Sequence, residues 1–115
     1  MKQYNFPDRK LIYVAGPYGQ PDPVVNTHWI IQVAEEILEL GYTPIVPHLS
    51  LLWHLVSPHE VDFWYNYDLA ILARCDAMYR SPGISSGSDN EVKYAESKGI
   101  PVFYSLYDLY KDVPR

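Results

Sequence analysis

The sequence predicts an α/β fold of three layers, in which helices cover both faces of a parallel sheet of four to five strands. Short apolar runs bounded by Gly and Pro alternate along the chain with longer segments whose apolar residues recur at helical spacing. The 115 residues match one ordinary domain, and 48% of them are apolar, which is enough for a core. Strands that alternate with helices are typical of right-handed crossovers and a parallel sheet.

The first half of the chain predicts two strands, a long helix and a long connection. The apolar run Leu11–Ala15 is closed by Gly-Pro, which indicates a buried strand, and a loop rich in Gly and Pro spans Gly16–Pro23. Apolar residues recur at helical spacing over Val24–Leu40, and a glycine follows as a C-terminal stop. Thr43–Pro47 predicts a second strand, and Pro47–Pro58 is a long connection.

The second half continues the alternation to the end of the sequence. Its predicted elements are, in order, a helix at Glu60–Arg74, a strand at Ala77–Arg80, a loop at Ser81–Ser88, a helix at Asp89–Lys98, a strand at Ile100–Tyr104 and a helix at Leu106–Lys111. This order predicts a flavodoxin-like or Rossmann-like sandwich. We expect residues 1–115 to form a single domain, with residues 1–9 as a polar N-terminal arm.

Three loops are expected to meet at the ligand-binding edge of this sheet. Folds of this class bind ligands outside the carboxyl ends of the parallel strands. The loops that follow the first three predicted strands are Gly16–Pro23, Pro47–Pro58 and Ser81–Ser88. Any functional site is therefore expected among them.

Composition excludes several classes of function. Nine basic and 14 acidic side chains give a net charge of −5 without a basic cluster, which argues against a nucleic-acid partner. No apolar run reaches about 18 residues, so no membrane span is expected. The start MKQYNFPDRK lacks the apolar core of a secretory signal. A lone cysteine, Cys75, excludes an internal disulfide and suits a reducing compartment, so a cytoplasmic location is expected.

Histidines and aromatic residues are numerous. His48, His54 and His59 do not have zinc spacing, so no metal or other cofactor is expected. His48, just after the second strand, is positioned to hydrogen-bond a ligand, whereas His28 and His59 are expected at the surface or as polar core residues. Eleven Tyr and three Trp indicate a core or a homo-oligomer interface more than a pocket that stacks on a planar ring. Cys75 is expected to be buried.

The stretch SGSDNE, at 86–91, has two interpretations. Ser88 and Glu91 have the spacing of a capping box, which would make Glu91 a structural residue. Alternatively, the loop delivers the Glu91 carboxylate to a pocket, where the helix dipole keeps it ionised as a nucleophile requires. The hydroxyls and N–H groups of Ser85–Ser88 also form a natural anion site, although the segment is neither a Walker loop nor a dinucleotide fingerprint.

Asp68 is the second carboxylate of interest. It lies within a predicted helix, in YNYDL, and Asp is a poor helix former. It is either a solvated residue paired with Arg74 or a lysine, or a functional group among aromatics that raise its pKa.

Three stretches, taken in order, resemble the nucleoside 2-deoxyribosyltransferase superfamily, which includes the 2'-deoxynucleoside 5'-monophosphate N-glycosidases. They are LIYVAGPYG, YNYDLAILARCDAMY and GISSGSDNEVKYAESKGIPVFY, and the resemblance runs from Leu11 to about Tyr104. It implies cleavage of an N-glycosidic bond through a covalent glycosyl-glutamate. Glu91 matches the family nucleophile, Asp68 the aspartate that holds the sugar and assists protonation of the base, and Tyr13 a tyrosine near the nucleophile.

The resemblance also implies binding residues and a substrate. Gly16, Tyr18 and Gly19, after the first strand, would border the nucleotide. Family transferases that act on free nucleosides carry Asp six residues before the nucleophile, and the monophosphate hydrolases carry Ser. Ser85 has that position here, so Ser85 with Gly87 and Ser88 favours a 5'-monophosphate. The loop differs in composition from either branch, and Ser86 or Ser88 is an alternative to Ser85.

Other functions stay open. They are hydrolysis or transfer to a second base, deoxyribosyl transfer on free nucleosides, a non-catalytic nucleotide-binding module of the same fold, and a structural or interaction protein. Relatives complete the site from a neighbouring subunit, so a homodimer or higher homo-oligomer is expected. The aromatic segment His59–Tyr67 is the first candidate for its interface.

Overall fold

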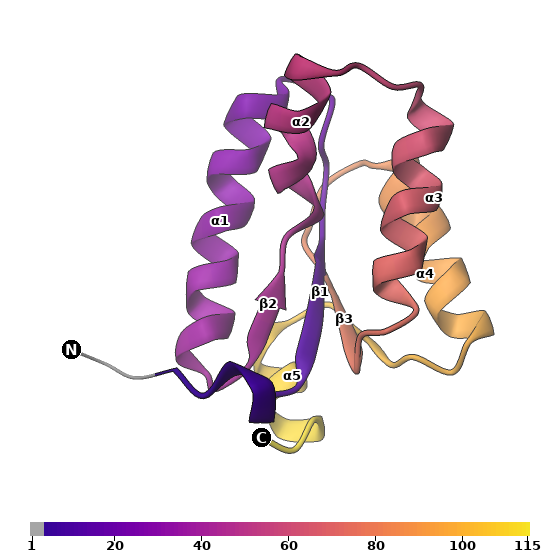
Figure 1. Ribbon diagram of the computed structural model, residues 1–115. Coiled ribbons are helices and arrows are strands. Elements are labelled where there is room, and N and C mark those ends of the chain that lie inside the picture. Colours follow the sequence, from indigo (N-terminus) through magenta and orange to yellow (C-terminus); the bar gives the residue numbers. More distant parts are fainter. Residues whose placement is uncertain (1–3) are drawn as a thin grey trace.

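The computed structural model describes residues 4–115 and contains a four-stranded parallel sheet, which confirms the predicted α/β class (Figure 1). The spatial order of the strands is β2-β1-β3-β4, so β1 and β3 form the centre. Their bounds are Leu11–Ala15 for β1, Thr43–Ile45 for β2, Ala77–Arg80 for β3 and Val102–Phe103 for β4. Each lies within its predicted range, and β1 and β3 match it at both ends.

Within residues 4–115, five α-helices and two short 3-10 helices surround the sheet. The bounds are Phe6–Asp8 for η1, Pro23–Glu39 for α1, Pro47–Ser50 for η2, Leu51–Val56 for α2, Val61–Leu72 for α3, Ser86–Ser97 for α4 and Leu106–Asp112 for α5. Helices α1 and α5 bury apolar side chains against one face of the sheet, whereas α3 and α4 pack against the other. Figure 1 shows α1 and α3 with α4 on opposite sides of β1, as a three-layer fold requires.

The alternation of side chains along β1 assigns each residue to one layer. Ile12 and Val14 pack in the core under α1 and α5, and Tyr13 and Ala15 pack in the core under α3 and α4. Successive side chains of a strand point to opposite faces, so Tyr13 faces the layer that contains Glu91 and Asp68.

The connection after β2 is the largest departure from the predicted secondary structure. Pro47–Pro58 was expected to be irregular, yet η2 and α2 occupy most of it. The segment LSLLWHLV lacks a capping side chain at its start, because the side chain of Ser50 makes no cap hydrogen bond. Without a start signal, a helix this short is not recognisable from periodicity.

Helix α4 begins at Ser86, three residues before the predicted start, and this corrects the capping interpretation of Glu91. The N-cap is Ser85, whose Oγ accepts a hydrogen bond from the Ser88 backbone N–H at 3.1 Å. Glu91 therefore lies in the second turn, beyond the reach of a capping box, which needs the third helical residue. Its carboxylate is free for another partner.

The predicted polar arm at residues 1–9 is described from Tyr4 onward; residues 1–3 lie outside the described part. Tyr4 and Phe6 stack with ring centroids 5.4 Å apart. Arg9 donates hydrogen bonds to the carbonyls of Leu38 and Tyr42. The described part of the arm therefore packs against the carboxyl end of α1, on the side of the sheet where the strands begin.

Two further findings concern expectations from composition. Cys75 is buried as predicted, and burial, with the nearby Asp76 carboxylate, raises the pKa of its thiol to about 12. Among residues 4–115, no helix is both long enough and apolar enough to cross a membrane.

Candidate active site

A pocket of about 910 Å³ lies at the carboxyl ends of the strands, where the fold class predicts a ligand site. It is walled by the loop after β1, by the η2–α2 connection with the start of α3, and by the loop after β3 with the start of α4. These are the three segments expected from the sequence. The pocket brings together ten of the predicted site residues, namely Gly16, Tyr18, Gly19, His48, Asp68, Ser85, Ser86, Gly87, Ser88 and Glu91.

Glu91 lies at the buried base of this pocket and is held by Tyr13. The Tyr13 hydroxyl donates a 2.5 Å hydrogen bond to Oε2 of Glu91, and Tyr13 is fully buried. Glu91 shares its inward helix face with Ser88, Val92 and Ala95, which follows from the three- and four-residue spacing of a helix. Tyr13, the remaining predicted site residue, is thus linked to the pocket through its hydrogen bond to Glu91.

The ionisation of Glu91 differs from the expectation. The helix dipole was expected to keep it ionised, but burial raises its pKa to about 7. The hydrogen bond from Tyr13 and the positive charge of Arg80 oppose this rise because both stabilise the carboxylate. A carboxylate one and a half turns into the helix, and 8% exposed, is too far from the end and too desolvated for the dipole to dominate.

Asp68 faces the same pocket from α3. Leu72, one turn further along α3, is fully buried, which identifies the inward face of the helix. Burial raises the pKa of Asp68 to about 7, with the negative charge of Glu91 as the second cause, so the predicted direction is confirmed. Within residues 4–115, the guanidinium of Arg74 instead donates from Nη1 to the Ala70 carbonyl. Among the residues described, Oδ1 of Asp68 has no hydrogen-bond partner.

The two carboxyl groups titrate as an interacting pair. Each raises the cost of ionising the other, so near neutral pH one proton on the pair is the favoured state. Glu91 has a phenol donor and a nearby guanidinium, whereas Asp68 has neither. These two groups stabilise the ionised form of Glu91 only, and with their effect included the pKa values of both carboxyl groups are raised to about 7.

The serine segment is ordered by its own hydrogen bonds. Oγ of Ser85 caps α4 and lies 3.0 Å from Oγ of Ser88. The Ser85 hydroxyl donates this hydrogen bond, so the proton of the Ser88 hydroxyl is the one left to reach an anion. Ser86 and Gly87 form the first turn of α4, where unpaired N–H groups favour negative charge.

His48 and His59 both line the pocket. His48 is 4% exposed, and its Nε2 donates to the Pro17 carbonyl at 2.9 Å. Burial lowers the pKa of His48, so the ring is neutral and holds the loop after β1; its contact with a ligand stays a prediction. His59, expected at the surface or in the core, is half-buried and lines the pocket. His28 is exposed as expected.

An aromatic cluster forms the outer wall, and sequence reasoning did not assign it to the site. His54 and Trp64 line the pocket, and Nε1 of Trp64 donates to Nδ1 of His54 at 2.7 Å. Trp53 packs edge-on against Trp64, and Phe63 stacks on His59 with centroids 3.7 Å apart. The signal available was the density of aromatic residues between 53 and 67, which indicated an interface as readily as a pocket.

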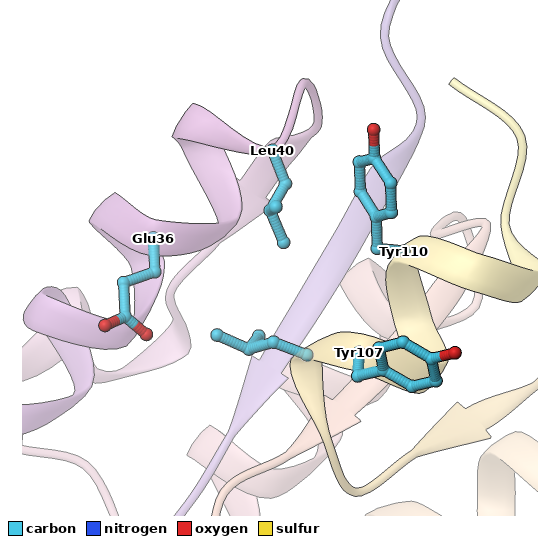
Figure 2. Close-up of a pocket in the computed structure, with 5 residues that line it drawn as sticks. Glu36, Leu40, Tyr107 and Tyr110 are labelled. Carbon is cyan, nitrogen blue, oxygen red and sulfur yellow. The ribbon is translucent and has the colours of Figure 1, made fainter.

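A second, smaller pocket of about 270 Å³ lies between α1 and α5 (Figure 2). Its lining residues are Glu36, Leu40, Leu106, Tyr107 and Tyr110. It contains none of the predicted site residues. Within residues 4–115, no group of three or more His, Cys, Asp or Glu side chains is arranged to hold a metal ion.

Comparison with known proteins places the chain in a family. Residues 10–105 match the family model described as domain of unknown function DUF7768, and the chain belongs to that family. A search of curated protein sequences gives no significant match.

Two solved structures show the same fold at low sequence identity. A 2-deoxyribosyltransferase from Leishmania mexicana is 22% identical over 81% of this chain, with a TM-score of 0.61. This chain spans 61% of the length of that protein. A 2-deoxyribosyltransferase from Bacillus psychrosaccharolyticus is 16% identical over 90% of this chain and 92% of its own, with a TM-score of 0.59. The chain therefore has a 2-deoxyribosyltransferase-like fold, in agreement with the resemblance in its sequence.

Proposed function

We propose that this chain cleaves the N-glycosidic bond of a nucleoside 5'-monophosphate, or of the deoxy form, through a covalent intermediate on Glu91. The observation that carries the proposal is the buried Glu91 carboxylate, held by the Tyr13 hydroxyl at the base of a pocket that also contains Asp68. One carboxylate and one carboxylic acid on the same pocket are what a two-step glycosyl transfer uses.

The proposed steps use Glu91 as the carboxylate and Asp68 as the acid. The Glu91 carboxylate attacks the anomeric carbon and forms a C–O bond. The C–N bond breaks, and the electron pair of that bond leaves with the base. The protonated Asp68, or a water that it positions, supplies the proton that the base takes up. In the second step, water attacks the same carbon and gives its proton to Asp68, which restores Glu91 and frees the sugar phosphate. A second base in place of water would make the reaction a transfer.

A substrate panel tests the reaction directly. Purified chain is incubated with ribo- and deoxyribonucleosides and with their 5'-monophosphates, and free base is separated by chromatography. We expect base release from at least one monophosphate, and a second base added in excess separates transfer from hydrolysis. An intact nucleotide that stays bound after long incubation would instead indicate a non-catalytic binding module.

The variant Ser85→Asp tests whether the substrate carries a 5'-phosphate that lies at Ser85. Asp is as good an N-cap as Ser, so the start of α4 is retained while a negative charge enters the anion site. Because like charges close together repel, we expect KM for a 5'-monophosphate to rise by about tenfold or more, with the matching nucleoside unaffected. Steady-state kinetics on both substrates measure this difference. An equal change for both substrates would contradict a phosphate at Ser85.

We also propose that a second copy of this chain covers the mouth of the pocket. Val56 and Val61 flank the pocket wall and are 79% and 81% exposed, with exposed Leu52 and Leu55 on the same connection. Contiguous exposed apolar surface beside a site marks an interface. The charged variant Val56→Glu with Val61→Glu is expected to be a monomer in light scattering, whereas wild type and the α5 control Tyr107→Glu are dimers or larger. A monomeric wild type would contradict this.

A further inference from the structure

Arg80 is a buried cation that the proposed reaction does not use. It ends β3, its side chain is only 8% exposed, and three hydrogen bonds fix its guanidinium. Nη1 donates to the Ser81 carbonyl. Nη2 donates to the Gly83 carbonyl and to Oδ1 of Asp89, and both of these hydrogen bonds are 3.0 Å long. One side chain therefore contacts the loop after β3 and the first turn of α4.

The loop that Arg80 holds packs closely against the loop after β1. Gly83 has a φ of +121°, and a Cβ there would lie 2.6 Å from Cγ of Pro17. A Cβ on Gly16 would lie 3.2 Å from Cβ of Ser81. The loops after β1 and β3 thus meet at two glycines, and Arg80 supplies the donors for the carbonyls on the β3 side. The same loop ends at Ser85, the cap of α4.

We propose that Arg80 is a positioning residue of this site, which fixes the 81–85 loop and the first turn of α4 and so sets where the Ser85 hydroxyl and the Glu91 carboxylate lie. This inference rests on the proposed function. A planar guanidinium is suited to the task, because its fixed fork of donors can satisfy two carbonyls and a carboxylate together, whereas an ammonium is a point charge. The loop then presents its hydroxyls and N–H groups in place before the substrate arrives.

The charge of Arg80 has a second effect on the pocket. The pKa of Glu91 is lowered by Tyr13 from β1 and by Arg80 from β3, and Glu91 in turn raises the pKa of Tyr65 and of Asp68 on α3. Asp89, on the same helix as Glu91, pairs with Arg80. Arg80 is the positive one, and it lowers the pKa of Glu91 against the effect of burial. Loss of this charge favours the protonated, non-nucleophilic form.

Three variants separate the two effects. Arg80→Lys keeps the charge but loses the fork, so we expect faster amide exchange over residues 81–85 and a KM for a 5'-monophosphate raised by about tenfold, with kcat and the acid limb of the pH profile little changed. Arg80→Met also loses the charge, and its acid limb moves to higher pH. Asp89→Asn, at an exposed position, removes the opposing negative charge and moves the limb to lower pH.

The controls keep the inference testable if a variant fails to fold. Arg74→Lys, at an exposed arginine in the turn after α3, is expected to change neither exchange nor kinetics. Asp89→Asn leaves Arg80 in place, so the shift of its acid limb can be measured even if Arg80→Met does not fold. Unchanged exchange at 81–85 and unchanged KM in Arg80→Lys would overturn the inference. A wild type that releases no base would overturn the proposed function instead, and amide exchange would still show whether Arg80 holds the loop.

Discussion

Glu91→Gln is expected to lower the rate of base release by at least about 10⁴-fold, because loss of a covalent nucleophile removes the whole two-step route. Glutamine keeps the size of the side chain and an oxygen that can accept from the Tyr13 hydroxyl. The fold should therefore be intact, and the loss should appear in kcat. Single-turnover release of base from the best 5'-monophosphate of the panel measures it.

The matched control is Glu96→Gln, at an exposed carboxylate of the same helix. This variant should keep the wild-type rate. A Glu91→Gln protein that releases base within about tenfold of wild type would show that Glu91 is not the nucleophile, since bystander carboxylates rarely contribute more than this. Mass spectrometry of quenched wild type should also show a sugar phosphate attached to the peptide that contains Glu91.

Asp68→Asn is expected to make the protein more stable than wild type at alkaline pH. The pKa of Asp68 is about 7 in the folded chain and near 3.8 when unfolded, so the folded state retains a proton that the unfolded state loses. The free energy of unfolding that wild type gains from the protonation of Asp68 is therefore fully present below about pH 4, and it falls as the pH rises toward 7. The neutral amide avoids that loss. We expect a gain of about 2 kcal/mol at about pH 8.5, because one pKa unit corresponds to about 1.4 kcal/mol and solvent in the pocket screens part of the shift.

Urea unfolding at several pH values measures this gain. The difference between Asp68→Asn and wild type should shrink as the pH is lowered through 7 toward 4, where wild-type Asp68 is protonated in both states. Asp62→Asn, at an exposed position in the first turn of the same helix, is the control and should differ from wild type by less than about 0.5 kcal/mol throughout. A gain that is independent of pH, or an Asp68→Asn protein less stable at every pH, would contradict the pKa assigned to Asp68.

Periodicity predicted the sheet well because the strands are short apolar runs with Gly or Pro beside them. Both ends of β1 and β3 were predicted, and the strand edge that holds the pocket followed from topology alone. The start of α4 was missed because three serines precede Asp89, and any of them can cap a helix. Only the backbone geometry at Ser85 decides among them.

The sequence predicted which residues gather at the pocket, and it predicted their ionisation less well, while their roles stay predictions. Alternation in β1 and helical spacing in α4 bring Tyr13 and Glu91 together, and both can be read from a sequence. The pKa of Glu91 depends on how deeply the second turn of α4 is buried, which a sequence does not give. Arg80 was not predicted as a site residue because an arginine after Ala-Met-Tyr resembles the polar end of a strand. Its three hydrogen-bond partners lie in the loop that follows and in the first turn of α4, and the sequence does not show these contacts.

The contact between the two glycine loops has a consequence for how the substrate range of this fold can change. On that side, the pocket wall has little room for change at Gly83, where φ is +121° and a Cβ would lie 2.6 Å from Cγ of Pro17, and Gly16 is tightly packed as well. The aromatic wall, from Trp53 to Trp64, is held by contacts among its own members, such as Trp53 with Trp64 and Phe63 with His59. Substitutions there can reshape the pocket while the position of Glu91 is conserved. Variants intended to change the shape of the pocket are therefore best placed in that wall.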